Sequence, residues 1–116
     1  MAIEFYQAYR KKLVLSFGAS DTEKSQEIYL DGLCHRLHVR LPNFSNAVTA
    51  TVAMADNDNY AYFEQTGLAK NANHNIAPDP PLLLLGEGGT VKVTLSGVPG
   101  GTGGEVVVAL YYWGRP

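Results

Sequence analysis

The sequence has little of what marks a secreted, membrane-spanning or nucleic-acid-binding protein. One cysteine, Cys34, stands among 116 residues, so no disulfide can form within the chain, which fits synthesis in a reducing compartment. Charged residues make up 17% and the formal net charge is −2, whereas nucleic-acid binders usually present a basic surface. No apolar run approaches the ~20 residues of a membrane span, and the first residues lack the apolar segment of a secretory signal. We therefore expect neither a nucleic-acid partner nor a membrane partner.

The sequence also lacks a recognisable reaction centre. In an extended strand Cys34 and His38 share a face but lie about 13 Å apart, too far to bind one zinc ion at about 2 Å each, and His35 points to the other face. The segment Asp56–Asn59 lacks the glycine and the glutamate that complete a calcium loop of the EF-hand type. Neither glycine-rich segment ends in the Gly-Lys-Ser/Thr of a phosphate loop. We expect no catalytic residue, no metal and no cofactor, and hence a protein that is not an enzyme.

What the chain does contain is alternation with a period of two residues, which is typical of half-buried β-strands. Hydrophobic residues make up 46% and glycines number 12, a composition that suits short strands joined by tight turns. The sequence predicts an all-β protein with one domain over residues 1–116, an antiparallel β-sandwich or jelly-roll-like barrel of about 7–8 short strands. The clearest alternating runs cover residues 11–17, 33–41, 47–54, 90–95 and 106–113.

The run 33–41 shows how the two faces are assigned. Strict alternation places four apolar residues and one histidine on one face, which are Leu33, Leu37, Val39, Leu41 and His35. It places Cys34 on the other face with three basic side chains, Arg36, His38 and Arg40. This basic stripe is interpreted as a solvated strand face, or alternatively as a docking site for an acidic protein surface.

Turn residues divide the rest of the chain. The range 47–65 is predicted to form one hairpin around a turn at Asp56–Asn59, followed by a second turn at Thr66–Gly67. Residues 78–81 contain three prolines, which exclude a helix or central strand, and Leu82–Leu85 is expected to be a strand covered on both faces. We expect a loop or single turn over Ser20–Glu27.

The C-terminal strand is apolar on both of its faces. Val106, Val108, Leu110 and Tyr112 alternate with Val107, Ala109, Tyr111 and Trp113. One face is expected to meet the core and the other to meet a second element or a second chain. The loop at residues 96–104 is glycine-rich because its backbone needs angles that other residues resist.

Aromatic side chains are the candidate interface residues of this sequence. The set is Phe5, Tyr6, Tyr9, Tyr60, Tyr62, Tyr111 and Trp113. Such side chains either fill the core, stack on sugar rings as in a carbohydrate-binding module, or anchor a protein interface. The first twelve residues, which hold three of them, are a possible extended N-terminal arm.

The segment VTLSGVPGGTGGEVVVALYYW, residues 93–113, and the segment LPNFSNAVTATVAMADNDNYAYFEQTG, residues 41–67, resemble small β-sandwich virion proteins of tailed bacteriophages and prophages. The likeness is to capsid decoration or cement proteins. The resemblance implies a non-enzymatic homo-oligomer that is made in the host cytoplasm, resides in the virion and binds the major capsid protein or another virion protein. No functional residue carries over. The alternative is a carbohydrate-binding or adhesion module, for example one associated with a phage tail.

Overall fold

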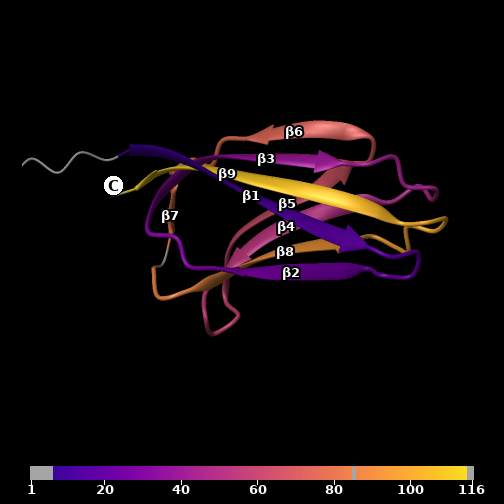
Figure 1. Cartoon of the computed structure of the whole chain (residues 1–116), viewed down its shortest axis with the longest axis horizontal. Helices are drawn as coiled ribbons and strands as arrows, with labels where there is room; N and C mark the ends of the chain where they lie inside the picture. The colour runs from indigo at the N-terminus through magenta and orange to yellow at the C-terminus, as the bar shows by residue number, and fades with distance from the viewer. Residues whose placement is uncertain (1–6, 85, 115–116) are drawn as a thin grey trace, which may run out of the picture.

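The structure is a computed structural model that describes residues 7–84 and 86–114, and it contains two antiparallel sheets (Figure 1). Sheet A has the strand order β1-β9-β3-β6, with β7 also paired to β3, and sheet B has the order β2-β8-β4-β5. The prediction of an all-β antiparallel sandwich is confirmed, and the described residues form nine strands in place of the expected seven or eight. The strands are β1 Gln7–Phe17, β2 Glu23–Ile28, β3 Gly32–Leu41, β4 Thr49–Ala55, β5 Ala61–Ala69, β6 Ala72–Ile76, β7 Leu82–Leu84, β8 Gly89–Leu95 and β9 Gly104–Gly114. The described part of the chain contains no helix that is long and apolar enough to cross a membrane.

The first and last strands pair along their whole length. Gln7 lies opposite Gly114 and Phe17 lies opposite Gly104, so β9 is a central strand between β1 and β3. Residues 7–12 of the expected arm belong to β1, and residues 1–6 lie outside the described part of the chain.

The inner faces of the two sheets form one hydrophobic core. Its members alternate along their strands, as the sequence predicted for β8, β9 and the second half of β3. No polar or charged side chain is buried among the described residues, so the core is held by apolar burial and packing. The central members are Leu13, Leu15, Phe17, Leu37, Val39, Leu41, Val52, Met54, Val91, Val93, Leu95, Val106, Val108 and Leu110.

A β-bulge in β3 overturns the predicted faces at the start of that strand. Cys34 lies opposite Tyr112 and Arg36 lies opposite Tyr111, so His35 is an extra residue with no partner in β9. An extra residue inverts the alternation on its N-terminal side. Cys34 is therefore fully buried on the core face and Leu33 is 39% exposed on the outer face. The prediction that Leu33 is buried with Leu37, and that Cys34 shares a face with His38, was wrong.

Two further expectations are corrected by strand pairing. Ser20–Glu27 was expected to be a loop or a turn, but Glu23–Ile28 forms β2 and pairs with β8. Because β2 is an edge strand, its polar residues remain exposed and only Ile28 is buried. Thr66–Gly67 is likewise no turn: β5 continues to Ala69, and Gly67 (φ 71°) is part of a bulge opposite β4.

The hairpin formed by β4 and β5 is confirmed, with its turn at the expected residues. Oδ1 of Asp56 accepts hydrogen bonds from the backbone N–H groups of Asp58, at 3.0 Å, and Tyr60, at 2.9 Å. Asn59 has a positive φ of 62°, which asparagine tolerates better than most residues. The turn is therefore closed by its own side chain.

The glycine-rich loop between β8 and β9 is fixed by hydrogen bonds to two other loops at the same end of the sandwich (Figure 1). The N–H of Asn46 donates to the carbonyl of Pro99 at 2.9 Å, and the N–H of Gly100 donates to the carbonyl of Ala19 at 3.0 Å. Gly103 has a φ of 74°, and a Cβ there would overlap the carbonyl oxygen of Phe17. Glycine is required at Gly103 by both conformation and space.

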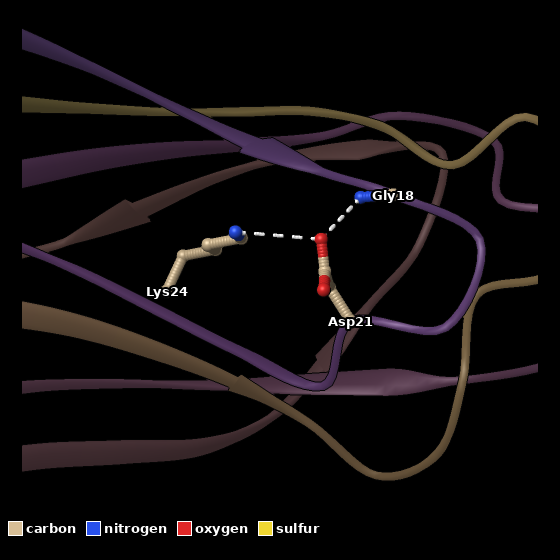
Figure 2. A network of polar contacts seen from close by, with 3 residues as sticks. All are labelled: Gly18, Asp21 and Lys24. Carbon is tan, nitrogen blue, oxygen red and sulfur yellow. Dashed lines mark hydrogen bonds and ion pairs between the residues drawn. The ribbon is translucent and has the colours of Figure 1, made fainter.

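The corner between β1 and β2 is held by a small polar network (Figure 2). Oδ2 of Asp21 accepts a hydrogen bond from the N–H of Gly18 at 2.7 Å and lies 3.4 Å from Nζ of Lys24. The Gly18 hydrogen bond, followed by the contact with Lys24, lowers the pKa of the Asp21 carboxyl. The ionised carboxylate therefore stabilises this corner.

Candidate functional surface

The outer face of sheet A carries cross-strand rows of side chains that register places next to one another. Directly opposed residues of an antiparallel pair share a face and lie within contact distance. Five rows run across the strands. They are Ala8, Trp113, Leu33 and Leu83; then Arg10, Tyr111 and Arg36; then Lys12, Ala109, His38 and Asn75; then Val14, Val107, Arg40 and Asn73; then Ser16 and Glu105.

The first of these rows, called here the apolar row, is an exposed hydrophobic strip made of Ala8, Trp113, Leu33 and Leu83. Trp113 is 44% exposed and Leu83 is 64% exposed. The bulge in β3 brings Leu33 to this face. The ring centre of His35, the extra residue of the bulge, lies 5.6 Å from the ring centre of Trp113. The expectation that residues 82–85 are covered on both faces was wrong for β7, because one face of this strand presents Leu83 to solvent. Leu85 lies outside the described residues.

Residues of the three following rows form a shallow depression, called here the basic hollow, of about 170 Å³. Its lining consists of Arg10, Lys12, His38, Arg40, Val107 and Ala109. Ala109 stands between Lys12 and His38 at the bottom of the hollow and is only 1% exposed, because the longer side chains around it cover it. The outer face of β9 was expected to be covered. In the structure Ala109 is covered, whereas Trp113 on the same face is 44% exposed.

The cations of this face have few partners within the protein. Nε of Arg10 donates to the hydroxyl of Tyr111 at 3.2 Å, and the guanidinium carbon lies 5.9 Å from the centre of that ring. For Lys12, Arg36 and Arg40 the described residues provide neither an ion pair nor a side-chain hydrogen bond. Four positive charges and one carboxylate, Glu105, therefore lie on one face of a chain whose formal net charge is −2.

A buried nitrogen of the basic hollow also lacks a partner. Nε2 of His38 is inaccessible to solvent and makes no hydrogen bond. Buried polar atoms are normally paired, and the described residues provide no partner for this one.

The predicted interface residues divide among several surfaces. Tyr111 and Trp113 lie on the outer face of sheet A, whereas Tyr9 lies on the other face of β1 and stacks on Tyr112 with 5.5 Å between ring centres. Tyr60, 76% exposed, and Tyr62, 38% exposed, belong to the β4–β5 hairpin of sheet B. Phe5 and Tyr6 lie outside the described residues.

Sequence reasoning missed four contributors to this face. Leu33 was assigned to the core because the bulge was not foreseen, and Leu83 was assigned to a covered strand. Arg10 and Lys12 were not connected with Arg40, because only the pairing of β1 with β9 and of β9 with β3 brings them together. The alternation of residues 8–16 was the one available signal for the face that Arg10 and Lys12 occupy.

Cys34 is placed where a thiol is least reactive. It is fully buried, and burial is the main cause that raises the pKa of the thiol. A raised pKa lowers the thiolate fraction and hence nucleophilicity. In the described ranges no group of three or more histidine, cysteine, aspartate or glutamate residues could hold a metal ion.

No protein-family model and no curated protein matches the chain. Among solved structures, it is similar to a protein of the Bacillus endospore appendages, described as disulfide-linked pili, with a TM-score of 0.56, 11% identity and coverage of 97% of this chain and 92% of that one. It is also similar to dimeric latent PorU from Porphyromonas gingivalis, with a TM-score of 0.47, 8% identity and coverage of 96% and 13%. TmCBM61, solved with β-1,4-galactotriose, gives a TM-score of 0.42, 14% identity and coverage of 97% and 91%. The likeness to the appendage protein shows a shared β-sandwich fold and nothing beyond the fold.

Proposed function

We propose that this protein is a non-enzymatic structural subunit of a phage particle that binds the capsid, or another virion protein, through the apolar row on the outer face of sheet A. The observation that carries the proposal is the apolar row, in which Trp113, Leu33 and Leu83 are all exposed on neighbouring strands. Exposed apolar residues that stand singly need no explanation, but a contiguous strip marks an interaction site.

The composition of this face favours a protein partner. Tryptophan, tyrosine and arginine are the residues that most often dominate binding energy at protein interfaces, and Trp113, Tyr111 and Arg10 lie in adjacent rows here. Four positive charges are few for a nucleic-acid surface, where affinity depends on releasing many counterions.

The alternative of a carbohydrate-binding module has less support from the geometry. A sugar-stacking platform is expected to draw on Tyr60, Tyr62, Tyr111 or Trp113, exposed in one flat row. The first two come from sheet B and the last two from the outer face of sheet A, so these four side chains do not form one platform.

The comparison with pili is relevant to assembly in one respect. A β-sandwich similar to this one occurs in appendages described as disulfide-linked. In this chain the one cysteine is fully buried, so a disulfide between folded subunits is not accessible. We therefore propose that its contacts are non-covalent.

The test is association with particles. Particles from a culture that expresses the protein are purified on a density gradient, and the protein is detected in the particle band with an antibody. We expect the wild type to co-migrate with particles and Leu83→Asp to lose at least about tenfold in occupancy, because a buried charge without a partner is strongly unfavourable. Val98→Asp is the matched control, since it introduces the same charge at an exposed apolar residue in the loop between β8 and β9, away from the outer face of sheet A. Absence of the wild type from the particle band would overturn the proposal.

A further inference from the structure

The basic hollow has the properties of a site whose partner is negative. Lys12 and Arg40 lie on strands that flank β9, and neither has an ion pair among the described residues. Like charges held together repel one another, and an interface gains specificity when a partner supplies the opposite charge. His38 adds a buried nitrogen that has no hydrogen-bond partner.

The same chain presents a negative projection at the tip of the β4–β5 hairpin. Asp58 is exposed in its turn, and Glu87 is exposed in the adjoining loop between β7 and β8; the described residues offer neither of them an ion pair. Tyr60 stands beside them, 76% exposed. Figure 1 shows the loop between β4 and β5 projecting beyond the two strands that it joins.

This tip is pre-shaped for binding. Oδ1 of Asp56 holds the turn through two backbone N–H groups, at 3.0 and 2.9 Å. Nδ2 of Asn57 donates to the carbonyl of Glu87 at 3.1 Å, which ties the turn to the loop before β8. A loop that is already ordered loses little conformational entropy when it binds.

We propose that the hairpin tip of one copy enters the basic hollow of a second copy. The carboxylates of Asp58 and Glu87 then face Lys12 and Arg40, and the ring of Tyr60 offers its face to a guanidinium. Because the tip and the hollow are different surfaces of the same molecule, the contact is head-to-tail and produces rings or open strings of subunits.

This inference deepens the proposed assembly role and rests on it, but its test uses purified protein alone. Sedimentation velocity over a range of concentrations reports self-association. We expect association of the wild type that weakens as salt rises from 0.05 to about 0.5 M, because exposed charges are screened within a few ångströms at high ionic strength.

The decisive experiment reverses the charges of the hollow in one variant and those of the tip in another. The double variant K12E/R40E has an acidic hollow and an acidic tip, and D58K/E87K has a basic hollow and a basic tip. We expect at least a tenfold weaker association for each variant alone, and recovery when the two are mixed, because each hollow then meets a tip of opposite charge. Circular dichroism before sedimentation establishes that each variant is folded.

Two single variants serve as matched controls. Lys11→Glu reverses the charge next to Lys12 on the opposite face of β1, and Glu64→Lys reverses a charge elsewhere in sheet B. Both are expected to associate like the wild type.

Three outcomes would overturn the proposed contact. They are a wild type that stays monomeric at all concentrations, association unchanged in K12E/R40E, and a mixture that does not recover. If a monomeric wild type instead binds a sulfated polysaccharide and K12E/R40E does not, the hollow binds a polyanion and the self-contact is rejected. Particle association, tested with Leu83→Asp, can succeed or fail independently.

Discussion

At the scale of single residues, two glycines with similar backbone angles have different reasons to be glycine. Gly103 (φ 74°) lies against the carbonyl of Phe17, whereas no heavy atom lies within 4 Å of a Cβ built on Gly67 (φ 71°). We expect Gly103→Ala to lower the free energy of unfolding by more than ~3 kcal/mol, because the backbone of β1 or β9 must move. Gly67→Ala should cost about 1–2 kcal/mol, the conformational part alone. Urea denaturation measures both, and equal losses would show that space at Gly103 is not limiting.

Asp21 is expected to give the protein a pH dependence in the acid range. Its pKa is lowered from 3.8, so its contribution to stability is fully present above that ordinary value and is lost as pH falls through the lower, folded value. Asp21→Asn keeps an oxygen for the Gly18 N–H but removes the charge. We expect the melting temperature of the wild type to exceed that of the variant slightly at pH 7 and to converge with it well below pH 4. A difference that persists at low pH would contradict the electrostatic origin.

At the scale of elements, the alternation of each strand determines which substitutions matter. Leu110 on β9 is fully buried between the sheets, and Leu83 on β7 is 64% exposed. Leu110→Ala is expected to lower the free energy of unfolding by about 2–5 kcal/mol, since it removes packed methyl groups and leaves a cavity. Leu83→Ala should change it by no more than about 0.5 kcal/mol. Urea unfolding checks both, and a large loss at Leu83 would mean that β7 is covered in solution.

The position of a strand could be predicted from the sequence where apolar residues recur at every second position along it. The run around Val93 alternates between apolar and polar residues, and its buried side was predicted correctly. The run around Val108 is apolar on both faces, so the sequence predicted a strand there but did not decide which face meets the core. Bulges were not predictable, because an extra residue such as His35 is defined only by the partner strand, β9. The edge strand β2 was missed for a related reason: its residues Glu23–Ile28 bury one side chain and so carry no apolar pattern.

The candidate surface was predictable in part for the same reason. Tyr111 and Trp113 were identified from their own strand, since both fall on the second face of β9. Their neighbours Arg10 and Leu33 come from strands far away in sequence, and register alone places them there. Local pattern therefore identifies the strand that carries a site, while strand pairing decides what the site contains.

At the scale of the whole molecule, both sheets contribute to one core, and the first and last strands pair along their whole length in sheet A. We expect unfolding in urea to be a single cooperative transition, as in most single domains of this size. The sequence has one tryptophan, Trp113, on the strand that pairs with β1, so its fluorescence reports on sheet A, while far-ultraviolet circular dichroism reports on both sheets. The two curves should have the same midpoint and the same slope, because β9 cannot separate from β1 and β3 without exposing Val108 and Leu110 to water. If fluorescence changes at lower urea while circular dichroism stays native, β9 detaches before the core opens, and the two sheets do not unfold as one unit.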